Sequence, residues 1–155
     1  MSKFIAFKGG KIAYSVKGKG RALVFLHGFL ESREIWKSFM QSLSHNFKIV
    51  TIDLPAHGES STYGYVNSME EMAEALRAVL DSLKLRKYVL IGHSMGGYVA
   101  MAFAEKYPDS ILGIVMFHST AQADKADRKE SRKKMIELVK IQKNKILAAL
   151  IASLF

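Results

Sequence analysis

The chain has 155 residues and a formal net charge of +9, with 49% apolar and 24% charged residues. This balance is typical of a globular domain with a sizeable core and argues against a disordered or fibrous chain. Cysteine is absent, which excludes a disulfide framework, a thiol nucleophile and a thiolate metal site. We see neither a signal-peptide core nor an apolar run of membrane-spanning length, so we expect a cytoplasmic protein without a membrane span.

The first 60 residues predict a β-hairpin, a buried strand and a helix. Residues 4–7 and 11–16 are short β-type runs around a Lys-Gly-Gly turn, which indicates a hairpin. Residues 22–26 are apolar without alternation, a pattern that favours a central parallel strand covered on both faces. Ser32 is placed to cap a helix over residues 33–43, and residues 47–52 form the next predicted strand.

The middle of the chain continues this alternation. Ser68 and Glu71 form a capping box at the start of a helix that runs to about residue 83. Residues 88–91 and 111–117 are predicted strands, with a helix over residues 98–106 between them. Because strands and helices alternate and crossovers are right-handed, we predict an α/β fold with a mostly parallel sheet and helices on both faces. Residues 1–118 would form this core.

Residues 119–155 have a different character. They carry nine Lys and Arg against four Asp and Glu, and they predict an amphipathic helix within 122–144 and a strongly apolar helix over 146–155. We interpret this segment as a helical cap or lid. Its basic face is expected to be solvated, and docking on an anionic membrane surface is a weaker hypothesis. No nucleic-acid motif accompanies the charge, so no nucleic-acid partner is expected.

The strongest chemical signal is Gly92-His93-Ser94-Met95-Gly96, which lies between a predicted strand and a predicted helix. In that context Gly-x-Ser-x-Gly predicts a nucleophile elbow, a tight turn that holds the Ser94 hydroxyl at the N-terminus of a helix. Gly92 and Gly96 remove side chains that would collide across the turn. The alternative, a phosphate-binding loop, lacks the Gly-Lys-Ser/Thr sequence of a P-loop.

Three segments coincide in order, namely residues 26–29 (Leu-His-Gly-Phe), 53–60 (Asp-Leu-Pro-Ala-His-Gly-Glu-Ser) and 92–97. Together they resemble the α/β-hydrolase superfamily, in particular its small cytosolic esterase and lipase-like members, over residues 4 to about 118. The resemblance implies that Ser94 attacks a small-molecule acyl substrate and forms an acyl-enzyme, without a metal or cofactor. It also implies that the backbone N–H groups of Phe29 and Met95 form the oxyanion hole.

The resemblance assigns supporting roles to other residues. His27 and Gly28 match the family's oxyanion loop, with His27 as its brace, while His93 is expected to point away from Ser94. His57 is expected to support the site and not to act as the base. Serine at the elbow sets the chain apart from haloalkane dehalogenases and epoxide hydrolases of this fold, which use aspartate there, and it favours acyl transfer.

The chain departs from the family pattern after the sixth strand. The family places its acid and its histidine after the nucleophile, and this chain has no counterpart of the last two strands. By this interpretation the triad acid and histidine are missing, and His118, the only histidine after Ser94, is a candidate base. The strand over residues 111–117 would become an exposed apolar sheet edge.

Three interpretations of this departure stay open. The first, which we favour, is a fragment of a longer hydrolase, and the second is a split enzyme completed by a C-terminal chain. The third is a dimer that exchanges elements with a copy of itself or associates through the exposed edge. The predicted function is a serine hydrolase for a carboxylic ester or related acyl substrate. The alternative is a catalytically inactive fragment or a binding protein on a hydrolase scaffold. The bond type, whether ester, thioester, amide or C–C, is left open.

Overall fold

The computed structural model describes residues 2–141 of the chain, with side chains described as far as residue 137. The chain divides into two compact units, Met1–Ala121 and Gln122–Phe155. In the described part of the first unit, the elements are β1 (Lys3–Phe7), β2 (Gly10–Lys17), β3 (Ala22–Leu26), the 3₁₀ helix η1 (Arg33–Trp36), α1 (Lys37–Leu43), β4 (Lys48–Ile52), α2 (Met69–Ser82), β5 (Tyr88–His93), α3 (Met95–Lys106), the 3₁₀ helix η2 (Pro108–Ser110) and β6 (Ile111–Phe117).

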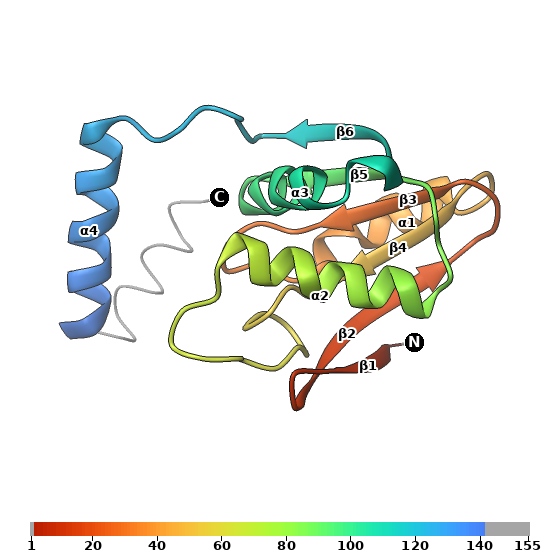
Figure 1. The fold of residues 1–155 in the computed structure, drawn as a ribbon, viewed down its shortest axis with the longest axis horizontal. Coiled ribbons are helices and arrows are strands. Elements are labelled where there is room, and N and C mark those ends of the chain that lie inside the picture. The colour runs from red at the N-terminus through yellow and green to blue at the C-terminus, as the bar shows by residue number, and fades with distance from the viewer. Residues whose placement is uncertain (1, 142–155) are drawn as a thin grey trace. The chain divides into compact units, whose positions relative to one another are not determined.

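The strands form one sheet in the order β1-β2-β4-β3-β5-β6 (Figure 1). β1 and β2 form the predicted antiparallel hairpin, and β2 also pairs antiparallel with β4. β3 pairs parallel with both β4 and β5, and β5 pairs parallel with β6. The predicted mostly parallel α/β sheet is therefore confirmed. The register sets Leu26 opposite Gly92, so the segments that leave β3 and β5 emerge side by side at the same sheet edge.

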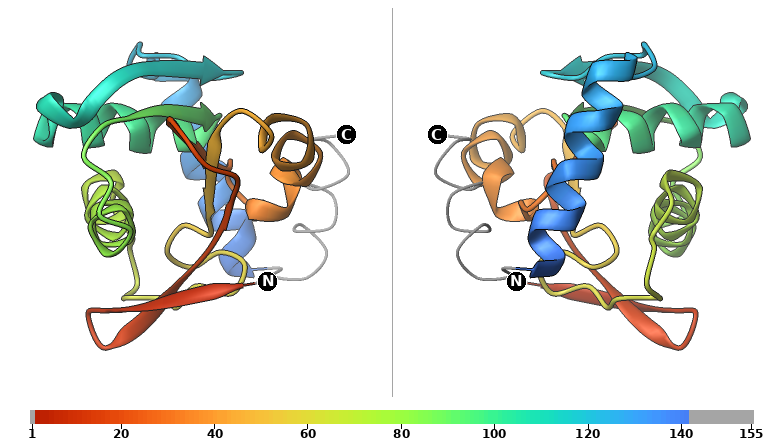
Figure 2. Two further views of the ribbon diagram at one scale, coloured as in Figure 1. Left: turned by 90° about the vertical axis from the view of Figure 1, so that its right-hand side faces the viewer. Right: turned by 90° about the vertical axis from the view of Figure 1, so that its left-hand side faces the viewer.

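Helices cover the two faces of the sheet (Figure 2), which explains why β3 lacks apolar alternation. Val24 and Leu26 belong to a buried cluster that includes the apolar faces of α2 and α3. Phe25 faces the other side and packs with Trp36, while Leu23 packs against the same smaller cluster. A strand that is buried on both faces must be apolar at successive positions.

The predicted helix that starts after Ser68 is confirmed as α2. The Ser68 hydroxyl accepts a hydrogen bond from the Glu71 N–H at 3.2 Å, and the Glu71 carboxylate accepts one from the Ser68 N–H at 3.4 Å. This reciprocal capping box satisfies two N–H groups that the first helical turn leaves without partners. The buried face of α2 comprises Met72, Ala73, Ala75, Leu76, Val79 and Leu80.

Two helices differ from the prediction at their N-terminal ends. The segment predicted as one helix over residues 33–43 begins as the 3₁₀ helix η1 and becomes α-helical at Lys37. Its first turn is fixed by a residue outside the helix, because the Arg33 N–H and guanidinium both donate to the carboxylate of Asp53. α3 begins at Met95 and not at residue 98, because the turn at Ser94 leads directly into the helix.

β6 is an edge strand of the described sheet, and three of its apolar residues are exposed: Leu112, Val115 and Phe117. In the second unit, α4 (Ala126–Ile141) accounts for most of the predicted amphipathic helix. The predicted apolar helix over residues 146–155 lies outside the described residues. The core–cap boundary at residue 118 stays a prediction. None of the helices in the described part of the chain has the length and apolar character needed to cross a bilayer.

Candidate active site

The turn between β5 and α3 holds Ser94 in an uncommon backbone conformation, with φ 48° and ψ −112°. A non-glycine residue in such a region costs about 1–3 kcal/mol and persists only where its surroundings impose it. Here the Ser94 N–H donates to the Phe117 carbonyl at 3.0 Å. The Ser94 carbonyl accepts from the Ser119 hydroxyl at 2.7 Å and from the Gly97 N–H at 3.0 Å. The end of β6 and the first turn of α3 therefore fix the serine backbone.

The glycines of this turn permit close backbone packing. A Cβ on Gly92 would lie 2.5 Å from the carbonyl carbon of Gly96. A Cβ on Gly96 would lie 2.8 Å from the His27 carbonyl oxygen and closer still to that of Leu26. The N-terminus of α3 thus packs directly on the end of β3. This packing brings the loop over residues 27–31, called the oxyanion loop after its predicted role, beside the Ser94 turn.

His27 is fully buried and both of its ring nitrogens are occupied. Nε2 accepts from the Leu54 N–H at 3.0 Å, so Nδ1 carries the proton and donates to the Gly28 carbonyl at 2.8 Å. Burial penalises the charged ring and lowers the pKa of His27 from 6.5 to about 4. His27 is therefore a neutral brace at pH 7 and has no free nitrogen with which to act as a base.

The bond from His27 also orients the next peptide group. The Gly28 carbonyl and the Phe29 N–H belong to one planar trans peptide unit, so they point in opposite directions. Fixing that carbonyl fixes the direction of the Phe29 N–H. Met95 is the first residue of α3, so its N–H has no acceptor within the helix. Neither N–H finds a backbone acceptor within residues 2–141.

A glutamate that the sequence analysis did not single out joins the two segments. Glu31 Oε2 accepts from the Gly28 N–H at 2.5 Å and contacts His93 Nδ1 at 2.8 Å. A Cβ on Gly28 would lie 2.7 Å from the same carboxylate oxygen, so glycine is needed for this approach. Glu31 and His93 are 62 residues apart in sequence, and no local pattern indicates their pairing.

His57 and His118 do not bond the Ser94 hydroxyl. His57 Nδ1 contacts the Pro55 carbonyl at 2.9 Å, and its ring centroid is 5.1 Å from that of His27. His118 is exposed at the end of β6 with a φ of 46°, and its ring centroid is 6.2 Å from that of His93. Within residues 2–141 no histidine ring is hydrogen-bonded to the Ser94 hydroxyl.

The loop over residues 53–60 is tied to η1 by a buried ion pair. The Asp53 carboxylate accepts from the Arg33 N–H at 2.7 Å, from the Glu59 N–H at 2.9 Å and from the Arg33 guanidinium. The same guanidinium reaches the Glu59 carboxylate and the Ser2 hydroxyl. These bonds position Leu54, whose N–H donates to His27 Nε2. Residues 53–60 therefore support the oxyanion loop through His27.

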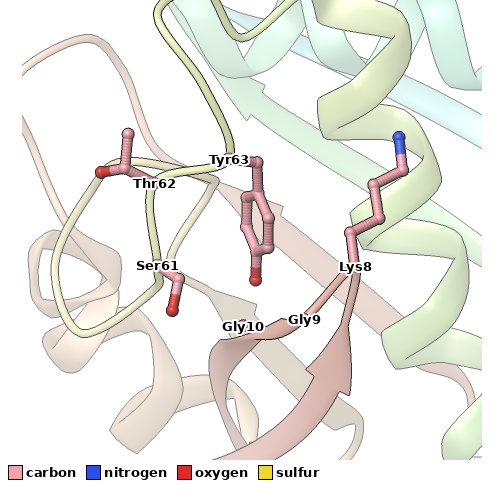
Figure 3. A pocket seen from close by; sticks show the side chains of 6 residues that line it. All are labelled: Lys8, Gly9, Gly10, Ser61, Thr62 and Tyr63. Atoms are coloured by element: carbon pink, nitrogen blue, oxygen red, sulfur yellow. The ribbon is translucent and has the colours of Figure 1, made fainter.

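A shallow pocket of about 390 Å³ lies elsewhere on the first unit, where the β1–β2 turn meets the segment over residues 61–63 (Figure 3). It is lined by Lys8, Gly9, Gly10, Ser61, Thr62 and Tyr63, and none of these belongs to the Ser94 turn or the oxyanion loop. Among the described residues, no group of three or more His, Cys, Asp or Glu side chains could hold a metal ion.

Comparison with known proteins gives one consistent family. A family model described as the alpha/beta hydrolase fold matches residues 21–136. A 2-hydroxy-6-oxononadienedioate/2-hydroxy-6-oxononatrienedioate hydrolase from Paraburkholderia phymatum is 30% identical over 125 residues, which cover 74% of this chain and 43% of that protein.

Solved structures agree with this match. A thermophilic esterase from Thermogutta terrifontis superposes with a TM-score of 0.86 at 34% identity, and the match covers 96% of this chain and 57% of the esterase chain. Est816, an N-acyl homoserine lactone degrading enzyme, superposes with a TM-score of 0.76 at 26% identity, covering 97% of this chain and 64% of that enzyme. The chain spans less than half the length of the curated relatives that it matches first.

Proposed function

Because the chain belongs to the α/β-hydrolase family, we propose that it is a serine hydrolase that cleaves a carboxylic ester or related acyl substrate, with Ser94 as the nucleophile. The observation that carries this proposal is the conformation of Ser94. Contacts with β6 and α3 impose its strained backbone. The Phe29 N–H in the adjoining loop and the Met95 N–H at the start of α3 have no backbone acceptor within residues 2–141. Strain that a fold maintains at a turn of this kind is typical of active sites.

The proposed reaction proceeds in two acyl-transfer steps. The Ser94 Oγ attacks the carbonyl carbon, its proton passes to a general base, and the carbonyl electron pair moves onto oxygen. The Phe29 and Met95 N–H groups stabilise this oxyanion, and each such donor is worth about 2.7–4 kcal/mol of the barrier. Collapse of the intermediate expels the alcohol or thiol with a proton. Water then attacks the acyl-enzyme and releases the carboxylic acid.

The general base in this proposal is a histidine paired with an acid. Serine hydrolases of this fold carry both after the nucleophile, in the order Ser, Asp or Glu, His. We place them in a C-terminal part of the complete protein or in a second chain that pairs along β6. His118 is the alternative base within this chain, since its backbone neighbour Phe117 bonds the Ser94 N–H.

A second candidate function is a binding protein on the hydrolase scaffold. The observation in its favour is that no histidine ring within the described range bonds the Ser94 hydroxyl. A serine without a base is a weak nucleophile. This function predicts saturable binding of a ligand without turnover.

Covalent labelling with a fluorophosphonate probe, measured by intact mass, tests the proposal. An activated Ser94 forms an Oγ–P bond while the P–F bond breaks and fluoride leaves, with the hydroxyl proton taken by the base. On the complete protein, which carries the base, we expect one adduct on the wild type and on Ser38→Ala, an exposed serine control in α1, and none on Ser94→Ala. An adduct that persists in Ser94→Ala would refute the nucleophile. A complete protein that folds but stays unlabelled would favour the binding function.

A further inference from the structure

We propose that Glu31 is a positioning residue that locks the oxyanion loop to the turn that carries Ser94. One carboxylate oxygen, Oε2, accepts from the Gly28 N–H of the loop and contacts Nδ1 of His93, the residue before Ser94. The inference rests on the proposed function, because Glu31 would act through the Phe29 N–H as an oxyanion donor.

The hydrogen bonds clamp Gly28 on both sides. Its N–H is held by Glu31, and its carbonyl is held by His27 Nδ1 at 2.8 Å and by the Glu31 N–H at 3.4 Å. The peptide that carries the Phe29 N–H therefore cannot rotate without breaking at least one of these bonds. Of these three contacts, only the one with the Glu31 carboxylate also extends to β5, so it ties the loop directly to the residue before Ser94.

The surroundings of the pair distinguish it from a surface ion pair. The side chains of Glu31 and His93 are only 18% and 24% exposed. The His93 ring is flanked by Trp36 and Phe117, with ring centroids 6.4 Å and 5.9 Å away. A hydrogen bond from a backbone N–H to a carboxylate is charge-assisted, and partial burial strengthens it.

Removal of the carboxylate should loosen the loop without unfolding the core. The His27 ring would still bond Leu54 and Gly28, so the buried brace survives. The Phe29 N–H would no longer be held at a set distance from Ser94. A misplacement of about 1 Å can cost about 10²-fold in rate, and loss of a whole oxyanion donor costs about 10²–10³-fold.

The experiment compares fluorophosphonate labelling of Glu31→Ala with that of Glu34→Ala, an exposed glutamate three residues along the same segment. For Glu31→Ala we expect the maximal labelling rate, kinact, to fall by about 10- to 100-fold, with KI unchanged. We expect kinact to fall and KI to stay constant because the oxyanion donor acts on the transition state and not on binding of the probe. Glu34→Ala should keep the wild-type kinact.

A double-mutant cycle with His93→Gln tests the bridge itself. If both residues act through one shared oxygen, the double variant with Glu31→Ala should lose no more kinact than Glu31→Ala alone. Fully additive losses would overturn the bridge.

The outcomes separate this inference from the function on which it rests. A complete wild-type protein that folds but stays unlabelled would refute the proposed function and this inference with it. Labelling that depends on Ser94 but proceeds at full kinact in Glu31→Ala would overturn only the role of Glu31. If Glu31→Ala does not fold, the labelling rate of the isosteric variant Glu31→Gln tests the inference in its place. A kinact below that of Glu34→Gln supports the inference, and an equal kinact overturns it.

Discussion

Lowering the pH from 7 to 5 should destabilise the first unit through a single buried ring, that of His27. Its pKa is about 4 in the folded chain, because burial penalises the charged form, against 6.5 when the ring is exposed to water. Between these values the unfolded chain binds more protons, so the free energy of unfolding falls as the pH falls. This linkage amounts to about 2 kcal/mol between pH 7 and pH 5, and approaches about 3 kcal/mol near pH 4.

Urea denaturation at pH 7 and at pH 5, followed by circular dichroism, measures this loss. The pH range ends at pH 5 because the carboxylates of Glu59, Glu70 and Glu74, whose pKa values are lowered by the hydrogen bonds that they accept, stay ionised above it. His27→Gln should be less stable at pH 7, yet should lose about 2 kcal/mol less on acidification. His45→Gln, an exposed control, should keep the full pH dependence. An unchanged pH dependence in His27→Gln would refute the assignment of a buried neutral ring.

Two further substitutions test the packing that positions the site. Gly96→Ala would press a methyl group against the Leu26 carbonyl, and we expect a loss of about 1–3 kcal/mol in urea denaturation together with slower Ser94 labelling. Gly113→Ala, where a Cβ meets nothing within 4 Å, should change little, so similar losses in both would contradict the packing argument. Arg33→Ala leaves a buried carboxylate without its cation and should cost about 3–5 kcal/mol, while the exposed Arg86→Ala should be near neutral. A loss under about 1 kcal/mol for Arg33→Ala would show that the pair is dispensable.

The elements of the core were predictable because they depend on local periodicity. The apolar run over residues 22–26 predicted a doubly covered strand, and Ser68 with Glu71 predicted the start of α2. Helix starts were less predictable where a contact from outside the helix decides them. Arg33 bonds Asp53, 20 residues away, and the segment over residues 33–36 is a 3₁₀ helix where an α-helix was predicted.

The candidate site was only partly predictable. Gly-x-Ser-x-Gly between a strand and a helix is a local pattern, and it located the Ser94 turn that the structure shows. The bonds that hold this turn come from distant segments. The Phe117 carbonyl ends β6 and the Ser119 hydroxyl follows it, and no sequence pattern indicates that they meet Ser94. The roles of Phe29 and Met95 as oxyanion donors stay predictions.

Local sequence patterns were enough to indicate which segments become strands and helices and which serine occupies the tight turn, because hydrophobic periodicity, capping residues and glycine spacing act within a few residues. The contact of Glu31 with Gly28 and His93, and the burial that keeps His27 neutral, depend on the three-dimensional fold. A hydrogen bond needs its partners within about 3 Å, and a pKa shift needs a specific burial. Both conditions arise when the parallel register sets the ends of β3 and β5 side by side.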